Sequence, residues 1–241
     1  MSLATISRTL ARETSALDTS GAAAFTYNPL EYARAPHEAY LEKYGASPKK
    51  ALLLGMNPGP FGMAQTGVPF GDVSMVRDYL GVTGRVKRPE HEHPKRPIEG
   101  FDCKRSEVSG TRLWGWAREH FPDPAQFFRH FFVVNYCPLV FMTETGSNLT
   151  PDKLPRALRE GIEETCDRAL VAQVKELEPE WVIGVGAFAH KQAQRALAGT
   201  QVKIGTILHP SPASPAANRG WAAQVTNQMV ALGVWPKKTA R

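Results

Sequence analysis

Three polar residues each come at or just after the end of a short apolar run: Asn57, Asn135 and His209. Short apolar runs of this kind are typical of buried strands. Ligands of an open parallel sheet bind beyond the carboxyl ends of its strands, so the three side chains are predicted to converge on one crevice. Two amides and an imidazole there would offer hydrogen-bond donors and acceptors, although an amide is no strong base.

The stretch over residues 52–72 begins in one of these runs and continues as a loop rich in glycine and proline. Its glycines are Gly55, Gly59, Gly62, Gly67 and Gly71, and its prolines are Pro58, Pro60 and Pro69. Glycine lets a backbone approach a ligand closely and proline presets a turn, so this loop can line a pocket with main-chain N–H groups. Asn57, Gln65 and Phe70 would add their side chains to the same wall.

A second loop, residues 209–215, starts at His209 and contains three prolines. The prolines stiffen the loop, hold His209 at its base and leave the tip projecting, so the two loops are expected to face each other. Ser211 in this loop lacks the G-x-S-x-G elbow of a hydrolase nucleophile, so a serine hydrolase is not predicted.

A metal site is one alternative, because His91 and His93 stand beside Glu90 and Glu92. No further cluster of His or Cys completes a ligand set, so we predict no metal and no cofactor. The three cysteines are Cys103, Cys137 and Cys166. An odd number without a C-x-x-C pair speaks against a disulfide framework, a four-cysteine zinc site and an iron–sulfur cluster.

Length and composition favour one domain, since 241 residues that are 42% hydrophobic suit a single fold with a sizeable core. The net charge of +6 suits a polyanionic partner without requiring one. The start of the chain has no long apolar segment, and no apolar run approaches the length of a membrane span. Neither secretion nor membrane insertion is therefore predicted, and a reducing cytosol is the expected compartment.

Apolar runs and helical periodicities alternate along the chain. Strands are predicted over residues 51–54, 131–134, 181–185 and 202–208. Helices are predicted around residues 40–44 and over residues 73–80, 110–121, 151–179, 187–197 and 220–232, with irregular segments at 82–109 and 136–151. This alternation predicts an α/β fold: a single domain with a central, mostly parallel four-stranded sheet flanked by helices on both faces.

Two motifs resemble the active-site motifs of the uracil-DNA glycosylase superfamily, and specifically of its single-strand-selective monofunctional (SMUG) family. They are Gly55-Met56-Asn57-Pro58-Gly59, extended through Gly67-Val68-Pro69-Phe70-Gly71, and His209-Pro210-Ser211-Pro212. Segments at residues 93–97, 106–110, 135–139 and 148–151 also resemble the family. Asn-Pro-Gly alone is most often only a turn, but this resemblance runs in order through roughly residues 27–235.

The expected organisation is a flexible segment over residues 1–26, a uracil-DNA glycosylase-like catalytic domain over residues 27–235 and a basic tail over residues 236–241. The resemblance implies a monofunctional glycosylase that hydrolyses the N-glycosidic bond of uracil in DNA and leaves an abasic site for base excision repair. It extends the expected substrates to 5-hydroxymethyluracil or other deaminated bases, in single- and double-stranded DNA. Its monofunctional character agrees with the lack of a lysine in either motif, because no Schiff base can form there.

The resemblance also implies roles for individual residues. His209 would donate a hydrogen bond to the departing uracil, whose negative charge grows in the reaction, and Asn57 would position the attacking water. Asn135 would read the edge of uracil, with a donor for O4 and an acceptor for N3–H, and Phe70 would stack on the base. Three further substrate-binding residues would complete the wall and the water site: Met56, Gly59 and Met63.

DNA contacts are expected on two segments. The resemblance places Lys95, Arg96, Lys104 and Arg105 on phosphates, although a basic loop is often simply solvated. The loop after His209, with Ser211, Ala213 and Ser214, would fill the gap left by a flipped base. Animal members of the family carry Arg-Asn where this chain has Ala213-Ser214, which leaves Asn218 and Arg219 as better candidates for holding the strands.

Two hypotheses from different classes remain open from the sequence: the glycosylase, and a non-catalytic protein of the same fold that only recognises damaged bases or nucleic acid. The presence of both Asn57 and His209 favours the glycosylase. A monomer that acts on DNA and binds no membrane is expected, cytoplasmic and associated with the nucleoid in a bacterium, or nuclear in a eukaryote. The order of preference among bases, and between single and double strands, is left open.

Overall fold

A parallel sheet of four strands forms the centre of the computed structural model, which describes residues 1–235. The strands are β2 (Ala51–Gly55), β3 (Phe131–Asn135), β6 (Trp181–Val185) and β7 (Lys203–Ile207), in the spatial order β3-β2-β6-β7. The chain thus leaves β2 for β3 on one side and then crosses back to β6 and β7 on the other. The predicted four-stranded sheet is confirmed, and the predicted basic tail, residues 236–241, lies outside the described residues.

The sequence of the central strands explains their position. β2 and β3 are buried along their whole length, and continuous apolar runs are typical of parallel strands that are covered on both faces. β7, at one edge, is less covered: Lys203 and Thr206 are exposed, whereas Gly205 and Ile207 are buried. The register places Gly55 opposite Asn135, so the last residues of β2 and β3 end at the same level.

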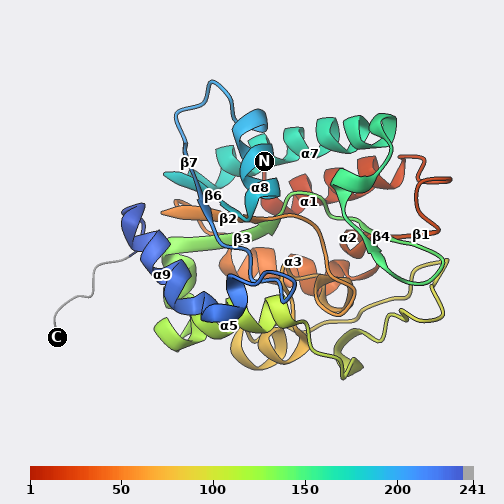
Figure 1. Ribbon diagram of the computed structural model, residues 1–241, viewed down its shortest axis with the longest axis horizontal. Helices are drawn as coiled ribbons and strands as arrows, with labels where there is room; N and C mark the ends of the chain where they lie inside the picture. The colour runs from red at the N-terminus through yellow and green to blue at the C-terminus, as the bar shows by residue number, and fades with distance from the viewer. Residues whose placement is uncertain (236–241) are drawn as a thin grey trace.

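Helices cover both faces of the sheet (Figure 1). On one face lie α7 (Arg156–Leu177) and α8 (Ala187–Ala196); on the other lie α3 (Arg34–Tyr44), α5 (Val108–His120) and α9 (Trp221–Ala231). The short helix α6 (Pro124–His130), which sequence analysis did not predict, leads into β3. The predicted helix over residues 73–80 is a single π-helical turn, Met75–Tyr79. No helix within residues 1–235 is both long and apolar enough to cross a lipid bilayer.

The expectation of a flexible segment over residues 1–26 is wrong for its first half. Helix α1 (Leu3–Ser15) packs along α7 and begins at Ser2, whose side chain accepts a hydrogen bond from the backbone N–H of Thr5. Leu3, Ile6 and Leu10 recur at helical spacing and are buried in the main core. Burial of this apolar stripe, rather than the Ser- and Thr-rich composition, decides the structure of the segment.

A second, smaller sheet replaces part of the predicted loop over residues 136–151. It has the order β1-β4-β5 and is antiparallel, with β1 (Phe25–Tyr27), β4 (Val140–Met142) and β5 (Asn148–Leu149). These strands are two or three residues long, too short for a period-two pattern to identify. The short helix α2 (Pro29–Tyr32) follows β1 directly.

Candidate active site

A cavity of about 340 Å³ lies beyond the carboxyl ends of the strands. Its walls include all seven residues predicted as catalytic or substrate-binding: Met56, Asn57, Gly59, Met63, Phe70, Asn135 and His209. It is also lined by residues to which the sequence assigned no role: Pro58, Pro60, Glu107, Ser109, Asn148, Thr150 and Pro212. A larger cavity of about 440 Å³, beside α1 and residues 87–91, contains none of the three strand-end residues. Chemistry rather than volume therefore identifies the candidate site.

Gly55, the last residue of β2, forms the floor between two predicted substrate-binding residues. A Cβ added there would meet the Oδ1 atom of Asn135 and would come within 2.6 Å of the Phe70 ring. The absence of a side chain at this position therefore lets the amide and the aromatic ring converge. The glycine that ends the apolar run in the sequence serves this close approach.

Phe70 adopts a backbone conformation that is unusual for a residue with a side chain, with φ of 54°. Its carbonyl oxygen accepts a hydrogen bond from the backbone N–H of Asp72 over 2.8 Å, and the Nε1–H of Trp114 donates to the neighbouring Pro69 carbonyl over 3.2 Å. The Phe70 ring lies 6.1 Å from the His209 ring, centroid to centroid. Strain of this kind persists where the surrounding structure holds it, and here it aims the ring into the cavity.

Asn135 is buried, and its amide is oriented by a neighbour. Its Nδ2 atom donates to the sulfur of Met63 over 3.3 Å, and Met63 begins the short helix α4 (Met63–Thr66). The contact sets the donor side of the amide next to Met63. The Asn135 side chain thereby presents both a donor and an acceptor at the cavity wall.

Asn57 is fixed in the complementary way. Its Nδ2 atom donates to the carbonyl oxygen of Leu139 over 3.1 Å, just before β4. With the amide nitrogen engaged by Leu139, the Oδ1 atom is the group of Asn57 that remains to accept a hydrogen bond. An amide held in this way can orient a water molecule.

His209 lies at the start of the loop after β7, and its ring is held by that loop. The backbone N–H of Ser211 donates to His209 Nδ1 over 3.1 Å, so Nδ1 is an acceptor and the proton of the neutral ring is on Nε2. Burial lowers the pKa of His209 below its usual value, which favours the neutral ring. His209 is therefore a neutral donor at the cavity wall.

The segment at the start of α5, residues 106–112, fastens the glycine-rich loop. Asp72 Oδ2 accepts hydrogen bonds from the Ser106 hydroxyl over 2.9 Å and from the Glu107 backbone N–H over 3.0 Å. Burial alone would raise the pKa of Asp72, but hydrogen bonds from Ser74, Glu107 and Ser106 hold it below its ordinary value. The Asp72 carboxylate therefore ties the end of the loop to α5.

Glu107 is the residue of this segment that reaches the cavity. Its Oε1 atom accepts a hydrogen bond from the Ser109 backbone N–H over 3.4 Å, at the N-terminus of α5. Burial raises the pKa of the Glu107 carboxyl, and the nearby charge of Asp72 adds to the rise. Glu107 is not among the site residues that the sequence predicts; its only signal there is its place in residues 106–110, one of the family-like segments.

Arg112, also absent from the sequence predictions, holds the second loop. Its Nη1 atom donates to the carbonyl oxygen of Pro210 over 3.0 Å, and its Nη2 atom donates to Asn218 Oδ1 over 2.8 Å. Asn218 in turn donates to the Pro212 carbonyl over 2.9 Å. The same helix, α5, thus fastens both loops that carry the predicted catalytic residues.

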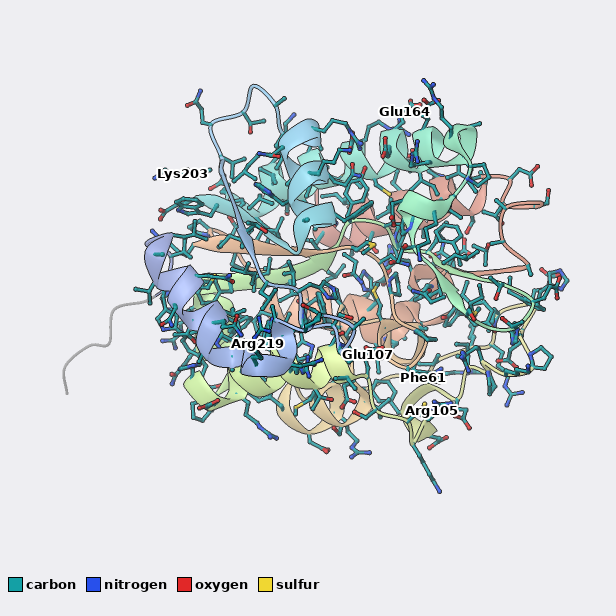
Figure 2. The ribbon with its side chains drawn as sticks, in the orientation of Figure 1. Phe61, Arg105, Glu107, Glu164, Lys203 and Arg219 are labelled. Carbon is teal, nitrogen blue, oxygen red and sulfur yellow. The ribbon has the colours of Figure 1, made fainter. Side chains whose placement is uncertain are left out.

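The residues predicted to contact DNA lie outside the cavity, except Ser211, which lines it. Lys95, Lys104, Arg105, Ala213, Asn218 and Arg219 are exposed, and Arg96 and Ser214 are half-buried. The Arg105 guanidinium lies 4.0 Å from the centre of the Phe61 ring, in the glycine-rich loop. Figure 2 shows Arg105 and Arg219 on opposite sides of Glu107. Positive side chains therefore flank the region of the cavity.

The histidine pair considered as a metal site is not arranged as one. His93 is buried; its Nδ1 atom accepts from the Lys95 backbone N–H over 2.9 Å, and its Nε2 atom is 3.1 Å from the Glu144 carbonyl oxygen. Within residues 1–235, no group of three His, Cys, Asp or Glu side chains is placed to hold a metal ion. Both ring nitrogens of His93 serve the backbone instead.

A further histidine supports the glycine-rich loop from behind. His37 Nδ1 lies 2.7 Å from the Gly67 carbonyl oxygen, and its Nε2 lies 2.8 Å from the Ser7 hydroxyl of α1. A carbonyl can only accept, so Nδ1 carries the proton and Nε2 accepts from Ser7. Burial lowers the pKa of His37 to about 4. Helix α1 is thus linked through His37 to the loop that forms the site.

Comparison with known proteins gives three kinds of match. The family model of the Uracil DNA glycosylase superfamily matches residues 42–231. The single-strand selective monofunctional uracil DNA glycosylase of Bos taurus is 51% identical over 216 residues, which cover 89% of this chain and 79% of that protein. The protein of that name from Rattus norvegicus is 52% identical over 215 residues, which cover 88% of this chain and 77% of that protein.

Among solved structures, the crystal structure of wild-type Pedobacter heparinus SMUG2 aligns with a TM-score of 0.64, covering 95% of this chain and 97% of that chain. At 18% identity, that match bears on the fold alone. The family model and the mammalian relatives cover most of the chain, including both loops of the cavity. The chain therefore belongs to the uracil-DNA glycosylase superfamily, in its single-strand-selective monofunctional family.

Proposed function

We propose that this chain is a monofunctional uracil-DNA glycosylase, which hydrolyses the bond between deoxyribose and uracil and leaves an abasic site for base excision repair. The observation that carries the proposal is that Asn57, Asn135 and His209, from three strand ends, line one cavity together with Phe70. The bovine and rat relatives are named for this activity.

The reaction breaks the C1′–N1 bond, and the base leaves with the electron pair. Water adds its oxygen to C1′, and the proton it loses is balanced by the proton that the uracil anion takes up. Charge therefore grows on both parts: positive on the sugar and negative on the base. His209 can stabilise the negative charge on the base, because its Nε2–H can donate a hydrogen bond to an oxygen of uracil while the Ser211 backbone N–H donates to Nδ1.

The attacking water is assigned to Asn57. Leu139 engages the amide nitrogen, so Oδ1 accepts a hydrogen bond from the water and directs it toward C1′. No strong base is needed when the water has only to trap a cation, and an amide is no strong base. Asn57 is therefore a positioning group rather than a proton acceptor.

Base recognition is assigned to Asn135, Phe70 and the wall residues Met56, Gly59 and Met63. The amide of Asn135 has a donor for O4 and an acceptor for N3–H of uracil, a pattern that cytosine reverses. Phe70 stacks on the ring, an interaction worth roughly 1 to 3 kcal/mol that does not depend on which base is bound. Discrimination against cytosine then comes from Asn135.

The DNA must present the base outside the stack, which costs a few kcal/mol in a duplex and less in a single strand. Lys95, Arg96, Lys104 and Arg105 would hold phosphates on one side of the cavity. Ser211, Ala213 and Ser214 would stand in the gap, with Asn218 and Arg219 beside them. We include 5-hydroxymethyluracil among the substrates and both single- and double-stranded DNA among the partners, with the protein acting as a monomer.

Two features favour hydrolysis over a lyase reaction or binding alone. Among residues 1–235, none of those that line the cavity is a lysine, so no amine is placed to form a Schiff base with the sugar. Both the oriented amide of Asn57 and the neutral donor His209 are present, although recognition alone requires neither. No feature of residues 1–235 favours the non-catalytic alternative.

The proposal is tested with a single-stranded oligonucleotide that contains one uracil. Treatment with the protein and then alkali should cleave the strand at the uracil, because alkali breaks abasic sites. The variants His209→Ala and Asn57→Ala should lose most of the rate and still bind the oligonucleotide in a gel-shift assay. Absence of cleavage by the intact protein would exclude the glycosylase, and retained DNA binding would then favour the non-catalytic alternative.

A further inference from the structure

Glu107 is a half-buried acidic group that the proposed reaction does not use. Among residues 1–235, it is the one carboxyl in the cavity wall. Its side chain packs on the bare faces of two glycines. A Cβ added at Gly59 would meet Glu107 Oε2 and lie 3.1 Å from Cδ, and a Cβ added at Gly62 would lie 2.9 Å from Cγ. The carboxyl therefore sits against the segment between Gly59 and Met63.

The edges of a bound uracil indicate which atom faces this segment. Suppose that Asn135 hydrogen-bonds to O4 and N3–H of uracil and that His209 hydrogen-bonds to the other carbonyl oxygen, O2. Because N1 carries the sugar, C5 and C6 are then the only ring positions without a contact. Asn135 Nδ2 also contacts the sulfur of Met63, which places Met63 near the O4 end of the base. C5 is bonded to C4, so it faces the Gly59–Met63 segment, where Glu107 lies.

One oxygen of Glu107 is free to bind a ligand. Oε1 accepts from the Ser109 backbone N–H, whereas no group within residues 1–235 donates a hydrogen bond to Oε2. Glu107 is half-buried, so this oxygen is an unpaired acceptor at the cavity wall, and a ligand that covers it without supplying a donor would leave it desolvated at a cost. A hydroxyl group carried on C5 of the base is such a donor.

We propose that Glu107 is a specificity-determining residue, whose carboxyl accepts a hydrogen bond from a hydroxyl on the C5 substituent of a damaged uracil. The inference rests on the proposed glycosylase function and goes further, because it names the group that distinguishes C5 substituents. A hydroxymethyl group satisfies the carboxyl. The methyl group of thymine occupies the same place without a donor and leaves the carboxyl desolvated, so the site disfavours the normal base.

The experiment compares three single-stranded oligonucleotides that differ only in one base: uracil, 5-hydroxymethyluracil or thymine. The measured quantity is kcat/KM for base release by wild type, Glu107→Gln and Glu107→Leu. Glu107→Leu should lower the ratio of 5-hydroxymethyluracil to uracil by about tenfold to 100-fold and should raise the ratio of thymine to uracil. Glu107→Gln keeps the size and an acceptor oxygen without the charge, so the 5-hydroxymethyluracil ratio should fall less.

Ser106→Ala is the matched control. Ser106 is exposed, lies next to Glu107 and donates to the Asp72 carboxylate, yet it does not line the cavity. Loss of the Ser106 hydroxyl disturbs the start of α5 without changing the residues that face C5 of the base. The kcat/KM ratios of 5-hydroxymethyluracil to uracil and of thymine to uracil should therefore stay at their wild-type values. Thermal melting of each variant reports folding, and Glu107→Gln carries the test if Glu107→Leu does not fold.

The outcomes separate this inference from the function on which it rests. If wild type releases no uracil, the proposed function fails. If wild type releases uracil but not 5-hydroxymethyluracil, or if the folded Glu107 variants keep both ratios, the glycosylase stands and the role of Glu107 is refuted. Equal changes in Ser106→Ala and the Glu107 variants would also refute it, because they would show an effect of α5 structure alone.

Discussion

The backbone N–H of Ser211 donates to Nδ1 of His209 over 3.1 Å, and this contact decides which ring nitrogen carries the proton. It leaves Nε2–H as the donor of the ring. Because the acceptor side is occupied by the protein's own backbone, a proton on Nδ1 would break the contact. The conformation of the loop and the protonation state of the His209 imidazole are thus set together.

Replacing His209 by alanine should lower kcat on a single-stranded uracil substrate by about 100-fold to 1,000-fold, because one donor to the leaving base is lost.

Since burial lowers the His209 pKa, the wild-type ring stays neutral as pH falls to 6.5, the ordinary histidine value, and is protonated only below it. The wild-type rate should therefore fall on the acid side of pH 6.5, measured by single-turnover kinetics from pH 8 to 5. A midpoint above pH 6.5 that vanishes in His209→Ala would contradict the neutral-donor assignment.

Gly55→Ala should abolish most uracil release, because the added methyl group would come within 2.6 Å of the Phe70 ring and would also meet the Asn135 amide. Displacing both groups should raise KM and lower kcat in steady-state assays. Gly115→Ala, in α5, is the control, since its methyl group meets only Met75 Cε at 3.9 Å. That variant should keep activity and melt no lower than wild type, as alanine favours helix over glycine. Normal kinetics for Gly55→Ala would mean that the two side chains do not form the base pocket.

Arg105→Met should reduce the salt dependence of binding to single-stranded DNA, if Arg105 contacts a phosphate. Each such contact contributes about 0.7 to the slope of log K against log salt concentration, so the slope should become shallower by about that amount. Fluorescence anisotropy over a salt series measures it. Lys203→Met is the charge-matched control, because Lys203 lies on β7, on the side of the molecule away from Arg105 (Figure 2). Equal slopes for wild type and Arg105→Met would remove Arg105 from the DNA interface.

Acid should weaken the fold through His37. Its pKa is about 4 in the folded chain and about 6.5 when unfolded, so below pH 6.5 the unfolded chain binds more protons. The stability from the neutral ring is fully present above pH 6.5 and is lost as pH falls toward 4, by about 3 kcal/mol. Urea unfolding of His37→Gln should show a flatter pH dependence over this range, with lower stability at pH 7. His91 is exposed, so His91→Gln is the control and should keep the wild-type pH dependence of the free energy of unfolding. If His37→Gln also kept that pH dependence, the acid sensitivity would come from another group.

The central sheet and the three strand-end residues could be predicted because the pattern is local. Asn57, Asn135 and His209 follow apolar runs, and parallel strands bring their carboxyl ends to one edge. Glu107 and Arg112 could not be found in this way. Glu107 contacts glycines of the first loop, and Arg112 donates to carbonyl groups of the second, both across a long sequence separation. The sequence at the start of a helix has no local pattern that indicates such contacts.

The short antiparallel sheet was missed for a related reason. β4 and β5 have two or three residues each and are defined by their partners, with Phe141 opposite both Thr26 and Leu149. Pairing over such distances leaves no periodic signal in so few residues. Yet this part of the chain matters to the site, because Leu139, next to β4, fixes the amide of Asn57.

The anchoring of α1 has a practical meaning for anyone who shortens the protein. A chain that lacks residues 1–26, and so begins where the family-like region begins, would keep every motif and every residue that lines the candidate active site. It would also uncover the apolar surface that Leu3, Ile6 and Leu10 now cover, and His37 would lose the Ser7 hydroxyl. We expect such a trimmed protein to self-associate, and any fusion partner should be attached without removing α1.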